Sequence, residues 1–229
     1  MLTIRGLNQF YGASHTLRDV GLEVRQGDCL CVMGRNGVGK TTLLRTIMGQ
    51  LGAASGSIVF DGVDLGSRPP ESRAGAGIGY VPQGREIFPQ LTVEENLMLP
   101  VARGRRHTIP DLVFDCFPVL REMLRRRGGD LSGGQQQQLA VGRALALEPR
   151  FLILDEPTEG IQPNIVHQIG TILERLRTDE KITILLVEQR LPMARRVAQR
   201  FCLLDRGGVV ARGDMEELSD DLVNAYLKV

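Results

Sequence analysis

The sequence predicts an α/β fold built on a mainly parallel sheet, and three observations support this prediction. Apolar runs at 29–33, 151–154 and 183–187 have the length and composition of buried strands. Stretches with helical periodicity, such as 165–176, stand between them. Each apolar run ends abruptly in glycine, carboxylate or amide residues, which places polar groups where ligands bind in open α/β sheets.

The composition is that of an ordinary globular protein. The chain has 229 residues, of which 42% are hydrophobic and 24% charged, so we expect one domain or one domain with a subdomain. A formal net charge of +1 gives no argument for a nucleic-acid partner or a membrane surface. No run of about 18 apolar residues and no signal-peptide pattern occurs, so we expect any membrane role to come from a partner. The four cysteines form no C-x-x-C pair, and we expect buried thiols in a reducing compartment at Cys29, Cys31, Cys116 and Cys202.

The first sixty residues favour antiparallel strands. Weak alternation at 2–7 and again at 17–24, together with the glycine-flanked run 57–60, predicts short strands of this kind. Tyr11 lies in a turn-like stretch between the first two strands.

A glycine-rich loop follows the apolar run at 29–33, and it has the G-x-x-x-x-G-K-T pattern of a phosphate-binding loop. Helical spacing begins directly after it, so the loop has the strand-before, helix-after context that the pattern requires. Glycines let backbone N–H groups approach an anion, and the helix directs its positive end to the same place. We expect Lys40 to contact the β- and γ-phosphates of ATP, and the Thr41 hydroxyl to bind Mg²⁺. The predicted nucleotide-binding residues of this segment are Gly34, Arg35, Asn36, Gly37, Val38, Gly39, Lys40, Thr41 and Thr42.

The middle of the chain is predicted to be mainly helical. Residues 66–79 are rich in glycine, proline and serine and favour a linker, and a short strand then ends at Pro82. Thr92 and Glu95 have capping-box spacing at the start of a helix. A longer helix is expected over 110–127, where apolar residues recur at helical spacing before a basic end.

A second candidate anion site is the start of the next helix. The segment Leu131-Ser132-Gly133-Gly134-Gln135 leads into three further glutamines and a stretch with helical periodicity. Ser132 and Gln135 again have capping-box spacing, and the glycines leave free N–H groups at the helix N-terminus. A helix N-terminus of this kind favours phosphate oxygens.

Two adjacent carboxylates follow the apolar run at 151–154. We expect Asp155 to take part in holding Mg²⁺, and Glu156 to act as general base or to position the attacking water. Neighbouring strand residues point to opposite faces, so both reach one site only if the strand ends there. Gln83 is a neutral amide at a hinge-like position, from which we expect it to reach Mg²⁺ or the attacking water.

The last third of the chain alternates strands and helices. The apolar run at 183–187 is followed by a helix predicted over 191–199. Residues 201–211 favour a hairpin across a glycine turn, and 216–227 favour a closing helix.

Four motifs in a fixed order carry a family resemblance. They are the phosphate-binding loop, Tyr80-Val81-Pro82-Gln83, Leu131-Ser132-Gly133-Gly134-Gln135 and Leu152-Ile153-Leu154-Asp155-Glu156. In this order and spacing they resemble the ATP-binding subunit of an ABC transporter, and the resemblance covers essentially the whole chain. It implies the ABC ATPase form of the P-loop NTPase fold within a single domain, 1–229. Such a fold has a RecA-like core at about 1–83 and 149–229, an N-terminal antiparallel β-region and an inserted helical subdomain at about 84–148.

The resemblance implies a nucleotide site shared by two subunits. They pair head to tail, and each ATP lies between the phosphate-binding loop of one subunit and the signature helix of the other. The residues expected to face the partner's nucleotide are Ser132, Gly133, Gly134 and Gln135.

Roles of individual residues also follow from the resemblance. Tyr11 matches the aromatic residue that stacks on adenine, and Glu156 matches the catalytic glutamate. Gln83 matches the loop that couples the site to the membrane subunit. Gln189 stands at the switch position beside the γ-phosphate. The resemblance implies that both take part in catalysis, together with Glu156. The expected Mg²⁺ ligands are Thr41, Gln83 and Asp155.

Two positions depart from the family pattern. The switch position is usually histidine and here is Gln189, and the loop after the acidic strand has Gln162 where aspartate is usual. A glutamine amide can hydrogen-bond the γ-phosphate but carries no imidazolium proton. This favours pairing with a related, non-identical ATPase over a homodimer. The same departures raise the alternative of a regulatory nucleotide binder that barely hydrolyses, and Glu156 argues against it.

The cargo is inferred from resemblance alone, because the matching stretches lie in the part that handles nucleotide. The glutamine at the switch position is similar to one ATPase subunit of importers for branched-chain amino acids and urea. Urea or a short-chain amide is the first expectation, and branched-chain amino acids are the alternative. The stretches that favour the urea type are 34–40, 82–89, 128–130, 135–138 and 159–163.

The expected partners are a second ATP-binding subunit, integral membrane permease subunits and, indirectly, an extracytoplasmic solute-binding protein. The chain would then lie peripherally at the cytoplasmic face of the cell (inner) membrane. An alternative of another class is a soluble ABC ATPase that works on nucleic acid or ribosomes. Such proteins usually carry tandem domains, coiled-coil insertions or basic patches, and this sequence shows none of these, so no nucleic-acid partner is expected.

Overall fold

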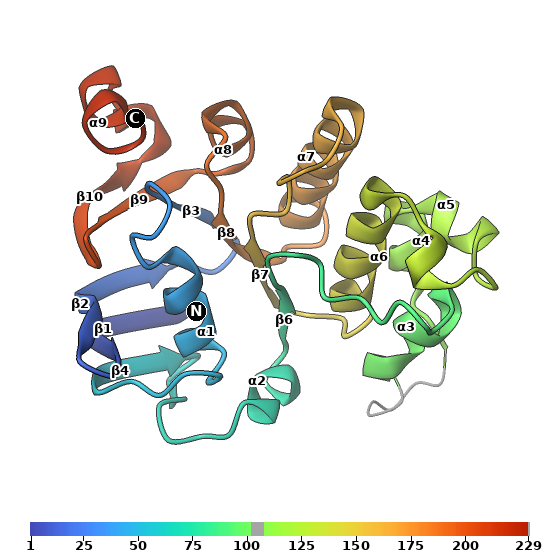
Figure 1. Cartoon of the computed structure of the whole chain (residues 1–229), viewed down its shortest axis with the longest axis horizontal. Helices are drawn as coiled ribbons and strands as arrows, with labels where there is room; N and C mark the ends of the chain where they lie inside the picture. Colours follow the sequence, from blue (N-terminus) through green and yellow to red (C-terminus); the bar gives the residue numbers. More distant parts are fainter. Residues whose placement is uncertain (102–107, 229) are drawn as a thin grey trace.

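Two sheets organise the computed structural model, which describes residues 1–101 and 108–228 (Figure 1). The four-stranded sheet has the order β2-β1-β4-β5 and its pairs are antiparallel, so the predicted N-terminal β-region is confirmed. The β1–β2 pair contains register shifts, which let β1 continue through residues that break the alternation of apolar and polar side chains. The strands of this sheet are therefore longer than predicted. The strands are β1 (Leu2–Tyr11), β2 (Ser14–Val24), β4 (Ser55–Phe60) and β5 (Val63–Asp64).

The six-stranded sheet forms the centre and has the order β10-β9-β3-β8-β7-β6. Its pairs are parallel except for β9 with β10, which form the predicted hairpin. The carboxyl ends of the parallel strands therefore meet at one edge, and the loops that follow them share that edge. The strands are β3 (Cys29–Met33), β6 (Ile78–Val81), β7 (Phe151–Asp155), β8 (Thr183–Val187), β9 (Arg200–Asp205) and β10 (Gly208–Asp214).

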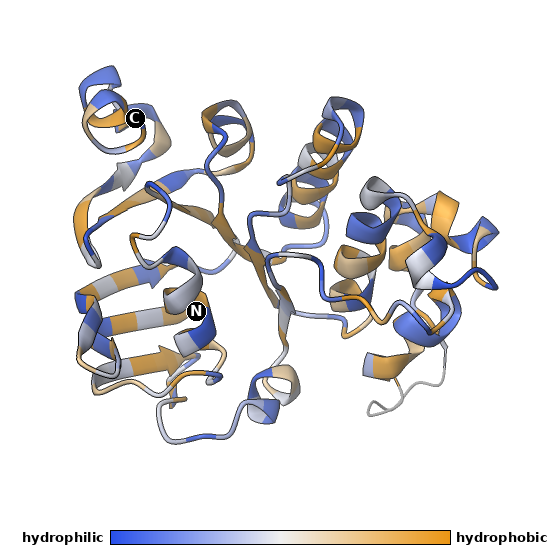
Figure 2. Cartoon of the chain, in the orientation of Figure 1, coloured by the Kyte–Doolittle hydropathy of each residue, from blue (hydrophilic) through white to orange (hydrophobic). Residues whose placement is uncertain are grey.

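Both faces of the central sheet are buried. In β3, Leu30 and Val32 pack with the antiparallel sheet and α1 (Lys40–Ile47), whereas the residues that alternate with them pack with α7 (Pro163–Thr178) and α8 (Leu191–Val197). Figure 2 shows the resulting hydrophobic band along the central strands. The four cysteines are buried and unpaired, as predicted.

The helices of the middle region pack around α6 (Gly133–Leu145), on the side of the molecule away from the antiparallel sheet (Figure 1). They are α3 (Val93–Val101), α4 (Asp111–Cys116) and α5 (Pro118–Glu122). Of the predicted helical subdomain at 84–148, residues 102–107 lie outside the described residues.

Both predicted capping boxes form. The Glu95 N–H donates to Thr92 Oγ1 at 3.1 Å, and the Thr92 N–H donates to Glu95 Oε2 at 2.7 Å. At α6 the Gln135 N–H donates to Ser132 Oγ at 3.3 Å, and the Ser132 N–H donates to Gln135 Oε1 at 2.9 Å. The local sequence pattern was sufficient to locate both helix starts.

The single helix predicted over 110–127 is wrong. It is divided into α4 and α5 at Phe117, whose φ of −134° and ψ of 74° are not helical. Proline disfavours the helical conformation in the residue before it, and Pro118 stands at that place. The basic end of the predicted helix lies beyond α5, and a short 3₁₀ helix follows at Gly128–Asp130.

Two further segments differ from the prediction. The linker at 66–79 contains a short helix, α2 (Glu71–Gly75). The closing helix is divided into a 3₁₀ helix, Met215–Glu217, and α9 (Asp220–Tyr226). Ser219 is the reason for this division, because it caps α9 by accepting the Leu222 N–H at 3.3 Å.

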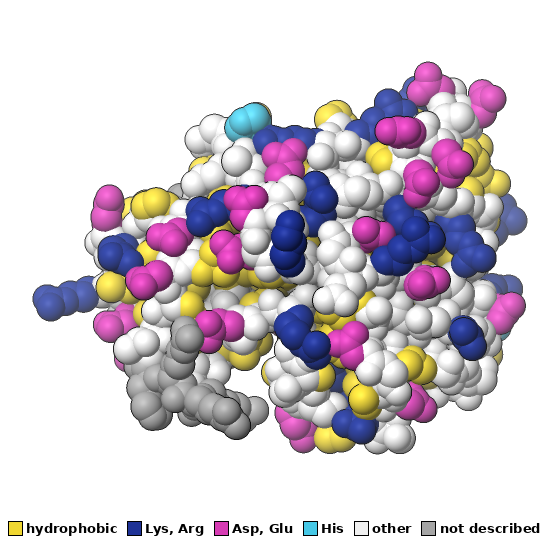
Figure 3. Space-filling model, turned by 180° about the vertical axis from the view of Figure 1, so that it is seen from behind, with side chains coloured by type: hydrophobic (Ala, Val, Ile, Leu, Met, Phe, Trp, Pro, Cys, Tyr) yellow, Lys and Arg dark blue, Asp and Glu magenta, His cyan; other side chains and the backbone are white. Residues whose placement is uncertain are grey.

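The surface carries charges of both signs. The face seen from behind in Figure 3 mixes Lys and Arg with Asp and Glu, in keeping with the net charge of +1. Among the described residues, no helix is both long and apolar enough to cross a membrane.

A buried arginine explains why α2 forms inside the predicted linker. Arg73 is 1% exposed, and its guanidinium donates to the carbonyl oxygens of Ile47 at 3.2 Å and Leu65 at 2.7 Å. It also donates to the carbonyls of Arg68 and Pro69. These contacts attach α2 to the end of α1, where a positive charge also suits the helix dipole.

We expect Arg73→Met to lower the free energy of unfolding by about 2–4 kcal/mol, because it leaves buried carbonyl oxygens without donors. Urea unfolding followed by circular dichroism measures this change. The matched control is Arg68→Met, whose side chain is exposed and whose effect should stay within about 0.5 kcal/mol. Equal stability of the Arg73 variant and the wild type would contradict the anchoring role.

Candidate functional site

The predicted phosphate-binding loop joins β3 to α1 at the carboxyl edge of the central sheet. Gly34 and Gly39 have φ values of +153° and +108°, which L side chains rarely adopt. A Cβ at position 34 would lie 2.4 Å from the Leu204 carbonyl oxygen, so glycine is required there. In the described structure α1 begins at Lys40 without a side-chain cap, which leaves its first N–H groups for another acceptor. The loop thus offers the backbone donors that a phosphate needs.

The ammonium group of Lys40 lies inside this loop. Its Nζ donates to the carbonyl oxygens of Gly34 at 2.8 Å and Arg35 at 2.9 Å. It also lies 3.5 Å from Glu156 Oε1, and its side chain is 5% exposed. These oxygens compensate the burial of the positive charge, and a phosphate entering the loop would compete for the same ammonium.

Asp155 is a buried carboxylate whose oxygens lack a close hydrogen-bond donor among the described residues. The residue is 1% exposed, and among the described residues neither carboxylate oxygen has a partner. Burial raises the pKa of Asp155 to about 6, and the nearby Thr41 hydroxyl acts in the opposite direction. Buried oxygens that lack donors, next to a hydroxyl, fit a hard divalent cation such as Mg²⁺.

The strand end brings the second carboxylate into the same site. β7 ends at Asp155, and Glu156 leaves the strand with φ +48°, a left-handed value that costs a non-glycine residue energy. The carboxylate of Glu156 accepts from Gln189 Nε2 at 2.5 Å, besides its contact with Lys40. Asp155 and Glu156 can share one site only if the strand ends between them, and β7 does end at Asp155.

Two amide side chains contact Glu156, and a third, that of Asn36, contacts one of these two. Gln83 Nε2 lies 3.4 Å from Glu156 Oε2 and donates to Glu159 Oε2 at 2.9 Å. Gln189 Nε2 also donates to Asn36 Oδ1 at 2.6 Å. The structure therefore brings together side chains from the phosphate-binding loop and from the loops after β6, β7 and β8.

Tyr11 lies at the end of β1 and is 47% exposed. The hairpin that carries it approaches the phosphate-binding loop, because a Cβ on Gly39 would lie 3.0 Å from Leu17 Cδ2 and 3.3 Å from the Thr16 carbonyl oxygen. An exposed ring on this hairpin is available for stacking on a base.

The residues of the second candidate anion site lie in a separate groove of about 430 Å³. Ser132 caps α6, and the side-chain oxygen of Gln135 is used in the capping box. The opposite wall comes from the loop after β7 and the start of α7, with Gln162 at the α7 N-cap. The signature residues lining this groove are Ser132, Gly133, Gly134 and Gln135.

Sequence reasoning missed several contacts of the site. Glu159 was not assigned a role, although it accepts from Gln83. The sequence motifs assign no role to Glu188 or Thr158, although a carboxylate directly after a buried strand is a recognisable signal. The Arg35 guanidinium reaches the carbonyls of Ala225 and Lys228 at the other end of the chain, a contact without a sequence signal.

Comparisons with known proteins found relatives over most of the chain. A family model described as ABC transporter matches residues 17–159. The chain is 41% identical over 213 residues to the high-affinity branched-chain amino acid transport ATP-binding protein BraG of Pseudomonas aeruginosa, covering 92% of this chain and 91% of that protein. It is 38% identical over 221 residues to LivF, a probable branched-chain amino acid transport ATP-binding protein of Archaeoglobus fulgidus, covering 95% and 94%. The structure of the ADP conformation of MJ1267, an ATP-binding cassette of an ABC transporter, is similar with a TM-score of 0.82 at 27% identity, covering 98% of this chain and 97% of that one.

We expect Asp155→Asn to stabilise the nucleotide-free protein at pH 8 by about 1–2 kcal/mol, because burial of this charge costs more than the nearby Thr41, Lys40 and Arg45 compensate. The raised pKa of Asp155 means that wild-type stability falls as the pH rises from about 4 to about 6, so the destabilisation is complete at pH 8. Thermal unfolding measures the gain, and a titration with Mg²⁺ and ATP should show weaker binding. The matched control, Asp205→Asn at the end of β9, should change neither quantity. A loss of stability in Asp155→Asn would contradict the assignment of a free buried charge.

Proposed function

Because the chain belongs to the ABC transporter family and is an ATP-hydrolysing subunit, we propose that it powers import of a small solute. The solute would pass through separate permease subunits. The observation that carries this proposal is the division of the nucleotide site. The phosphate-binding loop with Lys40 and Glu156 stands at the sheet edge, while the glycine-flanked start of α6 lines a groove of its own. Two half-sites of this kind are complementary if two chains pair head to tail.

Hydrolysis would use groups that are already in place. Lys40 would exchange the Gly34 and Arg35 carbonyls for phosphate oxygens, and Glu156 would accept a proton from the attacking water or orient it. Thr41, Asp155 and Gln83 would hold Mg²⁺, which when bound neutralises charge on the β- and γ-phosphate oxygens.

The proposed second ATPase subunit is a related but non-identical chain. Gln189 hydrogen-bonds Glu156 and Asn36 in the position where the family usually has histidine. An amide in that position supplies hydrogen bonds but no titrating proton, so a partner with a histidine would complete the more active site.

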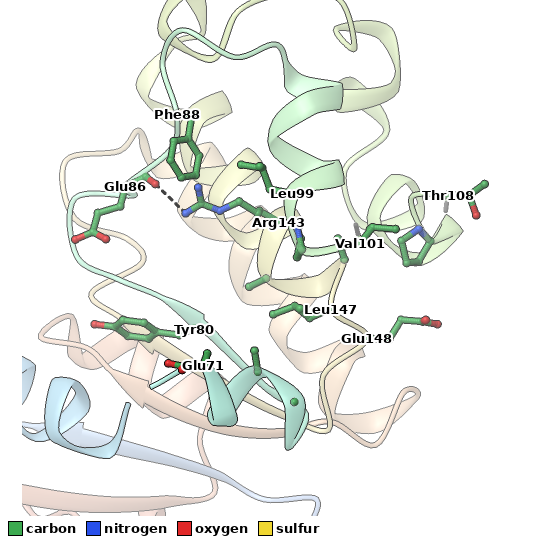
Figure 4. A pocket seen from close by; sticks show the side chains of 16 residues that line it. Glu71, Tyr80, Glu86, Phe88, Leu99, Val101, Thr108, Arg143, Leu147 and Glu148 are labelled. Carbon is green, nitrogen blue, oxygen red and sulfur yellow. Dashed lines mark hydrogen bonds between the residues drawn. The ribbon is translucent and has the colours of Figure 1, made fainter. Parts of the chain in front are cut away.

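The permease would dock in the groove between the core and the helical region. This groove has a volume of about 1080 Å³. Figure 4 shows Tyr80 on its core side and Phe88, Leu99 and Arg143 on the other. Phe88 and Leu99 are 49% and 42% exposed, so the groove offers apolar surface. Gln83 lies five residues before Phe88 in the sequence, so the proposed Mg²⁺ site and the proposed docking groove would share one short stretch of chain. The proposed location is therefore the cytoplasmic face of the membrane, with a solute-binding protein delivering cargo from the other side.

Two cargo classes are proposed. The sequence stretches described above favour urea or a short-chain amide, whereas BraG and LivF are ATP-binding proteins of branched-chain amino acid transport. The residues compared handle nucleotide and do not contact cargo, so transport itself must decide.

We expect Glu156→Gln to retain ATP binding and to hydrolyse ATP at least about 100-fold more slowly, because the amide accepts no proton. The variant should accumulate as a nucleotide-bound pair of subunits, measured by size-exclusion chromatography with ATP. The matched control is Glu159→Gln, which leaves the carboxylate of Glu156 in place and should remain within about tenfold of wild type. Unchanged hydrolysis by Glu156→Gln would place the base elsewhere.

Uptake of labelled urea and labelled leucine, compared between cells with the wild-type chain and cells with Lys40→Ala, tests the proposed function and its cargo. A Lys40 variant should lose uptake of the true cargo, because the ammonium that binds the phosphates is missing. Loss of urea uptake alone would support the urea class, and loss of leucine uptake alone the branched-chain class. Unchanged uptake of both would overturn the cargo proposals.

A further inference from the structure

We propose that Glu188 is a positioning residue for ATP hydrolysis, which acts through Gln189 and through the loop that carries Glu156. The inference rests on the roles proposed above for Glu156 and Gln189, and it assigns a role to a buried carboxylate that those roles do not use. Glu188 follows β8 directly and is 2% exposed.

Every oxygen of the Glu188 carboxylate has a partner. Oε1 accepts the backbone N–H groups of Gln189 and Arg190, both at 2.8 Å. Oε2 accepts the hydroxyl of Thr158 at 2.5 Å, and Thr158 is fully buried. Hydrogen bonds to an ionised acceptor are stronger than neutral ones, so this carboxylate holds its three donors firmly.

The contacts of Oε1 fix the turn between β8 and α8. By holding two successive N–H groups, Glu188 sets the backbone conformation at Gln189. From that backbone position the Gln189 amide reaches Glu156 Oε1 at 2.5 Å and Asn36 Oδ1 at 2.6 Å. A carboxylate is only an acceptor, so the amide nitrogen must face Glu156. The orientation of Gln189 thus depends on the turn that Glu188 holds.

The contact of Oε2 fixes the neighbouring loop. Thr158 stands between Glu156 and Glu159, and Glu159 accepts from Gln83 at 2.9 Å. The Thr158–Glu188 hydrogen bond therefore ties the loop after β7 to the loop after β8. A single buried side chain holds the two loops that present the proposed base and the proposed γ-phosphate contact.

A purely structural role makes a different prediction. The partners of Glu188 all lie in loops beside Glu156, whereas Arg73 is an equally buried polar side chain that binds carbonyls far along the chain from those loops. If Glu188 only supported the fold, its loss would act like the loss of Arg73. If it positions the site, its loss would slow hydrolysis without weakening ATP binding.

The test compares Thr158→Val, which removes the hydroxyl but keeps the shape, with Thr158→Ser, which keeps the hydroxyl. Glu188→Gln and Glu188→Ala form the second pair, because the glutamine still accepts the two N–H groups and its amide can donate to Thr158. Arg73→Met is the structural control. The rate constant of ATP hydrolysis with protein in excess, the Kd for ATP and the hydrogen exchange of the Gln189 and Arg190 amides are measured for each variant.

We expect Thr158→Val and Glu188→Ala to hydrolyse ATP about 10- to 100-fold more slowly, because small displacements of catalytic groups have effects of this size. Their Kd for ATP should stay within about twofold of wild type, and Thr158→Ser and Glu188→Gln should recover most of the rate. The two amides should exchange faster in Glu188→Ala than in Arg73→Met.

Wild-type rates in folded Thr158→Val, or an equal loss of rate in Arg73→Met, would overturn the inference. If Glu188→Ala does not fold, the Thr158 pair still decides the question. The role proposed for Glu156 is tested independently of this inference. It predicts that Glu156→Gln loses hydrolysis whatever the Thr158 variants do.

Discussion

The structure depends on how charged groups are compensated at the carboxyl edge of the central sheet. The ammonium of Lys40 and the carboxylates of Asp155 and Glu188 are buried there, where unpaired charges are costly. Lys40 is compensated by loop carbonyls and Glu156, and Glu188 by three donors. Asp155 is the exception, because its oxygens have no donor among the described residues. A site built in this way is prepared to receive a cation and an anion together.

The same edge shows how the fold separates the two parts of its nucleotide chemistry. The phosphate-binding loop belongs to the core, whereas the start of α6 belongs to the helical region and lines a groove with the start of α7. The capping box uses only acceptor atoms of Ser132 and Gln135, so the glycine N–H groups, the Ser132 hydroxyl and the Gln135 amide nitrogen remain as donors for an external anion. This arrangement makes a second chain a physical requirement of the proposed mechanism.

Predictions from the sequence succeeded where the cause is local. The two capping boxes, the antiparallel β-region and the buried strands of the central sheet all follow from patterns within a few residues. The failures have competing causes, one of them local and the other a contact with a distant segment. Apolar periodicity at 110–127 predicted one helix, and Pro118 divides it at Phe117. The helix α2 inside the predicted linker depends on Arg73, whose acceptors come from α1 and from the linker itself.

By itself the sequence determined the glycine loop, the acids at a strand end and the capped helix that begins at Gly133, because each depends on residue types at short spacing. The tertiary structure decided which of these groups meet. Gln189 hydrogen-bonds Asn36, 153 positions away, and Glu188 bonds Thr158, 30 positions away. Both contacts depend on the order and register of β3, β8 and β7 and on the left-handed turn at Glu156. Strand order and register arise from packing between distant segments, so spacing along the chain does not encode these pairs directly.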